Sequence, residues 1–198
     1  NFTNIHAGPK NYISENPHFA KSALARYTPS DFIAMVDRHK IAWHEKTLGQ
    51  LFCDDSAKDI IRMLLEEMRA VQVDLRLSCE ISDIAKGVDG FRLSTSEGQI
   101  LADNLVMACG GKSIPKMGAT GFAYRIAEQF GLPVTETRPA LVPLTLEPNL
   151  LGELSELSGV AVDADVSCGK TRFHEALLFT HRGLSGPSIL QISSYWRE

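Results

Sequence analysis

The sequence of 198 residues has no long apolar run, so it contains no stretch that could form a membrane-spanning helix. Its first residues, Asn1-Phe2-Thr3-Asn4, have neither a basic segment nor an apolar core, which excludes a secretory signal of the usual form. The chain also lacks an initiating methionine, and this indicates a fragment or a processed chain.

Cysteine is scarce, and its spacing matches no metal or redox motif. Cys53, Cys79, Cys109 and Cys168 never stand two to four residues apart, and the six histidines are equally scattered. We therefore expect reduced thiols, no metal site and a cytoplasmic protein.

Positive charge is also limited, since 20 Lys and Arg residues face 24 Asp and Glu residues, for a formal net charge of −4. No basic run stands out. This balance predicts that nucleic acid is not a partner. Hydrophobic residues make up 44% and charged residues 22%, a composition typical of a globular protein with one or two domains.

What the sequence does contain is a mixture of helical and strand patterns, which predicts an α/β (α+β mixed) fold. An apolar stripe behind Ser56 makes 57–70 the clearest helix, and Ser30 is the expected N-cap of another helix. We expect helices near 19–27, 30–39, 57–70 and 121–130, a hairpin at 41–53, strands at 73–81 and within 90–108, a small β region at 140–180, and a final helix from 185.

Two segments of the sequence resemble catalytic motifs without matching them fully. Gly110-Gly111-Lys112-Ser113 resembles the end of a P-loop, yet Val106 stands where the first P-loop glycine is needed. Residues 183–187 resemble a hydrolase nucleophile elbow, yet Pro187 replaces its last glycine. Neither an NTPase nor a serine hydrolase is predicted.

The apolar run 105–108, followed by Gly110 and Gly111, predicts a strand that ends in a ligand-binding turn. A tight turn without a ligand explains the same residues equally well. His181 and Arg182 precede the last expected helix and are the only candidates for a catalytic role, although loop residues of this kind are more often solvated.

Several segments together resemble the YhiN/BaiN-type flavoproteins. Asn1-Phe2-Thr3-Asn4 resembles the tail of the family's Gly-Arg-Cys-Asn-x-Thr/Ser-Asn segment, and 105–115 resembles its Ala-Thr-Gly-Gly-x-Ser-x-Pro motif. The resemblance continues, in register, through residues 22–27, 43–52, 118–131 and 177–196.

The resemblance implies a glutathione-reductase-like FAD-binding domain interrupted by an inserted β-barrel domain. Residues 1–138 would be the interior of the FAD domain, and 139–198 would begin the insert. By the same resemblance, the Gly-x-Gly-x-x-Gly pyrophosphate loop would precede Asn1, and the C-terminal return of the FAD domain would follow residue 198. We therefore expect the fragment alone to be inactive, to bind no FAD and to self-associate through open sheet edges.

For the parent protein, the resemblance implies an FAD-dependent oxidoreductase that uses NAD(P)H on an unidentified small molecule. The cofactor-binding residues that it implies are Asn1, Thr3, Asn4, Glu80, Ile81, Ala108, Cys109, Gly110 and Gly111. Two departures from the family pattern are Cys109, in place of threonine, and Phe122, in place of aspartate. The alternative is a non-enzymatic binding or scaffold module without a bound cofactor.

Overall fold

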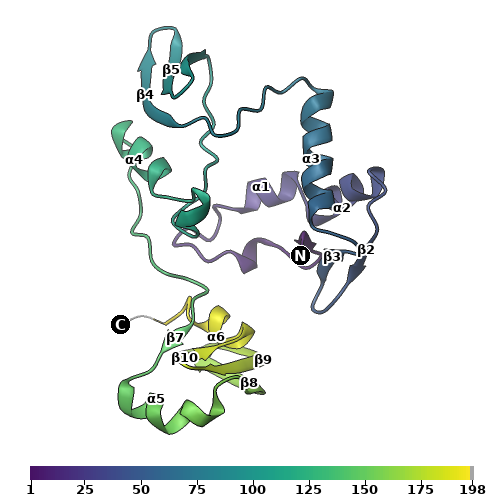
Figure 1. Ribbon diagram of the computed structural model, residues 1–198, viewed down its shortest axis with the longest axis vertical. Helices are drawn as coiled ribbons and strands as arrows, with labels where there is room; N and C mark the ends of the chain where they lie inside the picture. The colour runs from purple at the N-terminus through teal and green to yellow at the C-terminus, as the bar shows by residue number, and fades with distance from the viewer. Residues whose placement is uncertain (197–198) are drawn as a thin grey trace. The chain divides into compact units, whose positions relative to one another are not determined.

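The computed structural model describes residues 1–196, which form two compact units (Figure 1). The first contains Asn1–Ala85 and Arg92–Leu101, and the second contains Lys86–Phe91 and the residues from Ala102 onward. Helices and antiparallel sheets are mixed in the chain, as its patterns predict. None of the helices within residues 1–196 has the length and apolarity that crossing a bilayer requires.

The first unit begins with a small sheet whose strands have the order β1-β3-β2. Helices α2 and α3 stand beside this sheet in Figure 1, and their residues form its core. The elements are β1 (Thr3–Asn4), η1 (Pro9–Asn11), α1 (Lys21–Arg26), α2 (Pro29–Arg38), β2 (Trp43–Glu45), β3 (Gln50–Cys53) and α3 (Lys58–Ala70).

The core of this unit positions the N-terminal strand. Val36 of α2 and Met63 of α3 are buried together with Ile41. Phe2 packs on this cluster, with its ring centroid 6.1 Å from that of Phe32 and 6.3 Å from that of Trp43. Burial of an aromatic ring contributes a few kcal/mol, so Phe2 anchors the strand that follows it.

Local hydrogen bonds determine where α2 begins, and they correct one prediction. Thr28, not Ser30, is the N-cap, because its hydroxyl accepts the Asp31 N–H while the Asp31 carboxylate accepts the Thr28 N–H. Pro29 then occupies the first helical position, where a missing N–H costs nothing. The Thr28 hydroxyl also donates to the Asp31 carboxylate, and this bond, followed by the one from the Thr28 N–H, lowers the pKa of the Asp31 carboxyl.

A second sheet has the order β4-β5-β6, with β4 at Ile81–Gly87, β5 at Gly90–Thr95 and β6 at Gly98–Ala102. The strands predicted within 90–102 are thus confirmed. The strands predicted at 73–81 and 105–108 are wrong, apart from Ile81, which begins β4. Ser78 has φ +57°, which interrupts an extended strand, and neither segment has a paired strand among residues 1–196.

In the second unit, a loop leads through η2 (Pro115–Met117) to α4 (Phe122–Gln129), as the helix pattern at 121–130 predicts. Phe91, at the start of β5, contacts Phe130 at the end of α4, with ring centroids 6.0 Å apart. The β4–β5 turn therefore packs against the C-terminal end of this helix.

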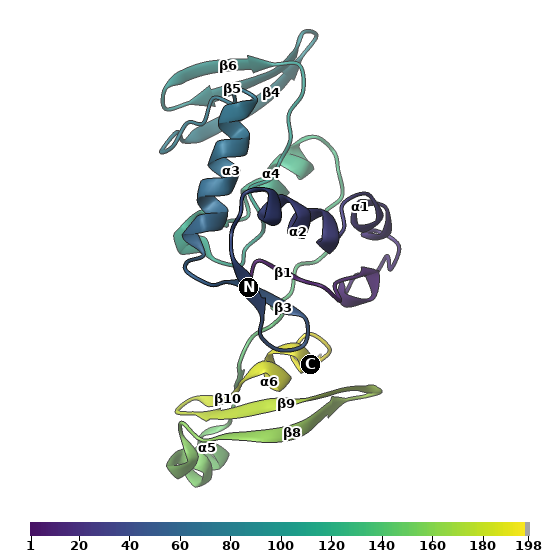
Figure 2. The ribbon, with the colours of Figure 1, turned by 90° about the vertical axis from the view of Figure 1, so that its right-hand side faces the viewer.

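The remainder of the second unit is a four-stranded sheet with the order β7-β10-β9-β8, on which α6 lies (Figure 2). Its Ser188 hydroxyl donates to the Ala176 carbonyl of β9 at 3.0 Å, which attaches the helix to the sheet. The elements are β7 (Leu144–Thr145), α5 (Pro148–Leu154), η3 (Ser155–Leu157), β8 (Ala161–Cys168), β9 (Thr171–Thr180), β10 (Gly183–Ser185) and α6 (Pro187–Ile192).

Within residues 1–196 this sheet is open, with β7 and β8 at its edges. The inserted barrel therefore stays a prediction, and so do the domain limits 1–138 and 139–198. Helix α5 lies inside the region 140–180, which was predicted as β structure, so that prediction is wrong for this stretch. Pro148 occupies the first turn of this helix, where a residue without an N–H is tolerated.

The predicted domain boundary can be tested by limited proteolysis of the full-length protein. Residues 133–140 have no helix or strand, whereas the N–H groups of Leu141 and Val142 donate to Ser194 and Ser193. We expect proteinase K, which has broad specificity, to cut within residues 133–140 before it cuts within α3, with the products identified by mass spectrometry. Earlier cleavage inside α3 would contradict the boundary.

Candidate functional site

Asn4 organises the turn between β2 and β3. Its side-chain amide donates to the Leu48 carbonyl at 2.9 Å, and its side-chain oxygen accepts the His6 N–H at 2.8 Å. Leu48 and Gly49 both have left-handed backbones, with φ of 52° and 77°. The Asn4 amide thus holds a turn that leucine adopts only at a cost.

The strands on either side of this turn carry a charged cluster. The Glu45 carboxylate accepts the Gly49 N–H at 3.1 Å, and the Lys46 ammonium lies 5.5 Å from the ring centroid of Phe52. On β2, His44 contacts the Asp54 carboxylate at 2.6 Å. Most of the polar side chains in this segment are therefore engaged in shaping the hairpin.

Replacement of Asn4 by alanine is expected to destabilise the first unit by about 1–2 kcal/mol, because two hydrogen bonds that hold the strained turn are lost. Hydrogen exchange should accelerate at residues 46–50. Asn4→Asp is the matched control: it keeps the acceptor for His6 and loses only the donor to Leu48. Unchanged exchange in Asn4→Ala would show that the turn does not depend on this side chain.

Glu80 and Ile81 lie beside a shallow pocket in the first unit. Two hydrogen bonds between Glu80 and Ser96 hold this edge together. The Glu80 N–H donates to the Ser96 hydroxyl at 3.0 Å, and the Ser96 N–H donates to the Glu80 carbonyl at 2.9 Å. The pocket is lined by Asp74, Arg76, Cys79, Ile81, Thr95 and Ile100. It combines apolar side chains with one guanidinium, which pairs with Asp74 at 2.8 Å.

Gly110, which is exposed, and Gly111, which is half-buried, lie in a loop that packs against the first turn of α4. Gly110 has φ +70°, and no atom lies within 4 Å of the position that a Cβ would take there. A Cβ at Gly111 would instead collide with the Tyr124 hydroxyl. The Lys112 ammonium lies 5.7 Å from the centroid of the Tyr124 ring, so the loop and the helix are joined through this tyrosine.

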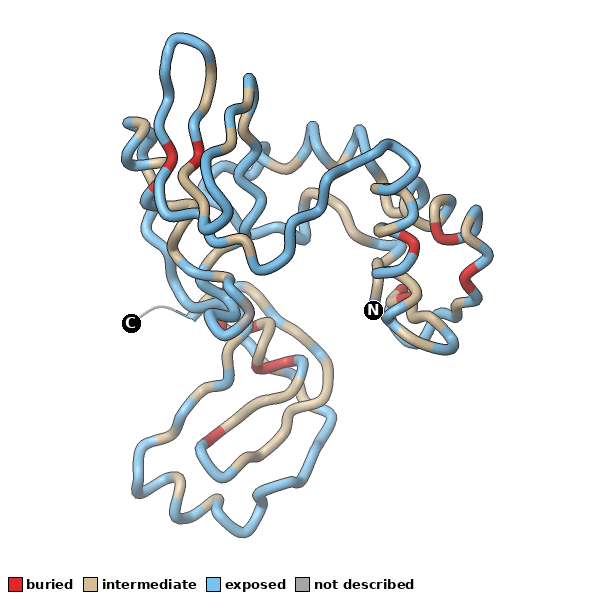
Figure 3. Tube along the Cα trace, turned by 45° about the horizontal axis from the view of Figure 1, so that its top comes forward, coloured by how far each residue is buried: buried red, intermediate tan, exposed pale blue. Residues whose placement is uncertain are grey.

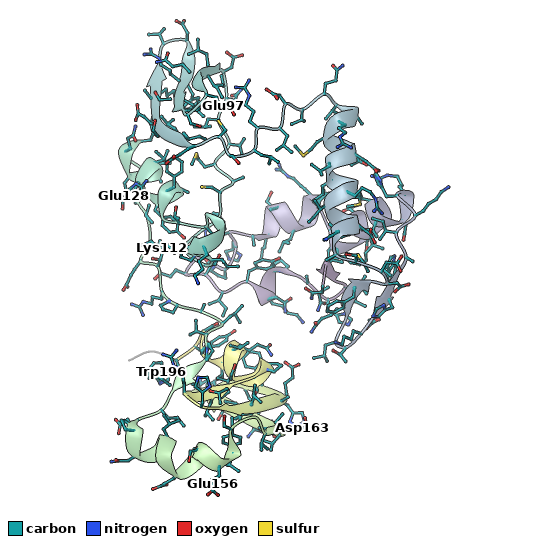
Figure 4. All side chains as sticks on the ribbon, viewed as in Figure 1. Glu97, Lys112, Glu128, Glu156, Asp163 and Trp196 are labelled. Carbon is teal, nitrogen blue, oxygen red and sulfur yellow. The ribbon has the colours of Figure 1, made fainter. Side chains whose placement is uncertain are left out.

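Figure 4 shows Lys112 on this loop and Glu128 near the other end of α4. Ala108 and Cys109 come directly before the glycines and are exposed. The bare backbone at Gly110 and the open space beside it fit the close approach of a flat or phosphorylated ligand.

Cys53 of the first unit and Cys109 of the second unit should differ in reactivity. Burial raises the pKa of the Cys53 thiol, and the Asp59 carboxylate raises it further, so less thiolate is present at a given pH. Cys109 is exposed. We expect iodoacetamide at pH 8 to label Cys109 several-fold faster than Cys53, as followed by peptide mass spectrometry. Equal rates would contradict the burial of Cys53.

His181 and Arg182 form the two-residue turn between β9 and β10, and both are exposed. The Arg182 N–H donates to the Thr180 hydroxyl, and the Arg182 carbonyl accepts the Leu146 N–H at 3.2 Å. These are the contacts of turn residues, and a catalytic role for either side chain stays a prediction.

The predicted cofactor residues fall into three groups. Asn1, Thr3 and Asn4 belong to the β1 segment, Glu80 and Ile81 to the start of β4, and residues 108–111 to the loop of the second unit. Reasoning from the sequence missed two features that contact these residues, the Leu48–Gly49 turn beside Asn4 and Tyr124 beside Gly111. A glycine after a short strand is the signal for the first, whereas no sequence signal pairs Tyr124 with Gly111.

Comparison with known proteins places these segments in a family. The HI0933-like protein Rossmann domain matches residues 1–189. The chain is 55% identical over 198 residues to a ribosomal RNA dihydrouridine synthase of Escherichia coli (strain K12) and 46% identical over 203 residues to one of Haemophilus influenzae (strain ATCC 51907 / DSM 11121 / KW20 / Rd).

A third relative is a 3-dehydro-bile acid delta(4,6)-reductase of Clostridium scindens (strain ATCC 35704 / DSM 5676 / VPI 13733 / 19), 25% identical over 202 residues. The alignments cover 100%, 100% and 98% of this chain and 50%, 50% and 48% of the three relatives, in the order given. The chain thus spans about half the length of these curated relatives.

These relatives correct one prediction from the sequence. A small-molecule substrate and the absence of a nucleic-acid partner were expected, and the two relatives named for ribosomal RNA contradict this. The physical reason is that a net charge of −4 is an average, and an average does not exclude a local cationic surface.

The match over residues 1–189 and the segments quoted from the sequence agree on one assignment. The chain belongs to the HI0933-like (YhiN/BaiN) family of FAD-dependent flavoproteins.

Proposed function

We propose that the full-length protein is an FAD-dependent oxidoreductase that reduces uridine to dihydrouridine in ribosomal RNA, with NAD(P)H as the electron donor. The observation that carries this proposal is the 55% identity, over all 198 residues, to a ribosomal RNA dihydrouridine synthase. The more distant bile acid reductase supports the reaction class, because both names describe the saturation of carbon–carbon double bonds.

The overall reaction is balanced by one donor molecule. Dihydrouridine differs from uridine by two hydrogens across the C5–C6 bond, so one hydride equivalent and one proton are added. NAD(P)H becomes NAD(P)⁺ as it supplies the hydride equivalent, and solvent supplies the proton. Bound FAD supplies the ability to carry two electrons between donor and substrate.

The residues of this chain fit a role in holding FAD. Gly110 offers unobstructed backbone, and Gly111 allows the loop to lie directly against Tyr124. The pocket beside Glu80 and Ile81 offers apolar side chains and one guanidinium, which suit a nucleotide. We propose that the loop at 108–111 in the second unit and, within the first unit, this pocket and the segment that contains Asn1, Thr3 and Asn4 are each FAD-binding segments of the full-length protein.

Complementation tests the proposed function. An Escherichia coli strain that lacks its 55%-identical relative is transformed with the gene for the full-length protein, and ribosomal RNA nucleosides are measured by mass spectrometry. We expect dihydrouridine to be restored. In a purified assay, ribosomal RNA from the deletion strain should become a substrate only when the protein and NADH or NADPH are both present.

The controls distinguish the reduction of ribosomal RNA from the activity of a general reductase, and they distinguish an enzyme from a binding module without a cofactor. Transfer RNA and a steroid enone serve as alternative acceptors, and the visible spectrum of the purified protein reports bound flavin. A yellow protein that reduces the enone and leaves ribosomal RNA unchanged would overturn the RNA substrate. A colourless protein without activity would favour a non-enzymatic module.

A further inference from the structure

The segment between β1 and α2 has a charge unlike that of the rest of the chain. Residues 9–27 contain three cations, Lys10, Lys21 and Arg26, and a single carboxylate, Glu15, whereas the whole chain has a net charge of −4. Within residues 1–196 no ion pair involves any of the three cations.

Exposed aromatic side chains lie among these cations along the segment. Phe19 is 81% exposed, Tyr12 52% and Tyr27 49%. No residue between 9 and 27 is buried, a property that the tube in Figure 3 shows along the chain. An exposed fraction of 81% is unusual for phenylalanine, and a group of such side chains indicates a surface that binds another molecule.

The segment is shaped by its own hydrogen bonds. The Asn11 side chain accepts the Gly8 N–H at 3.0 Å, and the Asn16 side chain accepts the His18 N–H at 3.0 Å. The Phe19 N–H donates to the Asn16 carbonyl at 3.0 Å, immediately before α1. These turns present Phe19 and the cations without the support of a hydrophobic core.

We propose that residues 9–27 form a surface for single-stranded RNA, on which Phe19 and Tyr12 stack against bases while Lys10, Lys21 and Arg26 neutralise phosphates. Cations interleaved with exposed aromatic rings are the features by which proteins hold unpaired nucleotides. This proposal rests on the proposed function, because reduction of a uridine requires access to a base that has left its stack.

The electrostatic part is tested with the full-length protein and a fluorescent single-stranded oligouridine, by anisotropy across a range of salt concentrations. Removal of Lys21 and Arg26 by a double alanine replacement should reduce the slope of log affinity against log salt by about 1.4. The matched control removes two exposed cations of α3 in the same unit, Lys58 and Arg69, and should leave the slope unchanged.

The aromatic part is tested at Phe19. Phe19→Leu keeps an apolar side chain and removes the ring, so affinity for the oligouridine should fall on the order of tenfold. Phe19→Tyr keeps the ring and should bind as the wild type does. Flavin content and the unfolding temperature are measured on each variant, and both should match the wild type.

The outcomes separate this inference from the proposed function. If the wild type forms dihydrouridine and the variants at Lys21, Arg26 and Phe19 bind RNA equally well, the inference is overturned and the function stands. If these variants lose flavin or stability while their RNA affinity is unchanged, the segment contacts protein or cofactor, and the inference is again overturned. If RNA binding depends on these residues but no dihydrouridine forms, the surface stands and the proposed function fails.

Discussion

Full-length protein that carries Gly111→Ala is expected to lose most of its FAD during purification. A Cβ at this position collides with the Tyr124 hydroxyl, so the Tyr124 side chain or the loop must shift. Such overpacking costs about 1–3 kcal/mol, which corresponds to about tenfold or more in affinity if the cost falls on the FAD-bound loop. The ratio of flavin to protein absorbance measures the loss, and the unfolding temperature of the apoprotein shows whether the fold is affected.

A double variant identifies the cause of that loss. Tyr124→Phe removes the colliding hydroxyl, and the next atom of the ring, Cζ, lies 3.5 Å from the position that the alanine Cβ would take, which is ordinary contact. If Gly111→Ala with Tyr124→Phe regains FAD, the glycine is needed only for packing on α4. If the double variant stays colourless while Tyr124→Phe alone is yellow, the cofactor itself requires bare backbone. A fully yellow Gly111→Ala protein would show that this loop does not limit FAD binding.

Gly183→Ala is expected to produce the largest loss of stability in the second unit, about 3 kcal/mol or more. Gly183 has φ +145°, and β10 pairs it with Thr145 of β7 and with Thr180 of β9. A Cβ there would collide with the Leu144 carbonyl, so the backbone of β7 would have to move in addition to the strain of the left-handed conformation.

Gly169→Ala is the matched control for this prediction. Gly169 also has a left-handed backbone, with φ +60°, but no atom lies within 4 Å of its missing Cβ. It should therefore cost only about 1 kcal/mol. Hydrogen exchange of peptides from β9 and β10, together with denaturant unfolding, measures both variants. Equal losses would show that backbone conformation, and not the contact with Leu144, explains the requirement at Gly183.

Elements that depend on nearby residues could be predicted from the sequence. Helix α3 follows from an apolar stripe of Ile60, Ile61, Leu64, Leu65 and Met68, although its buried residue, Met63, lies outside that stripe. Strands β5 and β6 follow from an alternating pattern interrupted by Gly98. The segments that resemble the HI0933-like family were equally accessible, because residue order alone carries them. In each case the information lies within a few residues of the element that it determines.

Partners that lie far apart in the sequence could not be predicted in this way. The alternation at 73–77 indicates two faces of a strand, but a strand also needs a hydrogen-bonded neighbour, and residues 1–196 provide none for this segment. The bond from Asn4 to Leu48 spans 44 positions, and no local pattern predicts it. The contact of Tyr124 with Gly111 likewise depends on how a helix packs against a loop.

The sequence alone determined the helices with clear apolar stripes, the short hairpins and the family, because each depends on neighbouring residues or on residue order. The tertiary structure decided which side chains hold the Leu48–Gly49 turn, why Gly111 has no room for a Cβ, and which aromatic rings between 9 and 27 remain exposed. Exposure and steric room are properties of the space around a residue. That space is filled by segments distant in the chain, so only folding defines it.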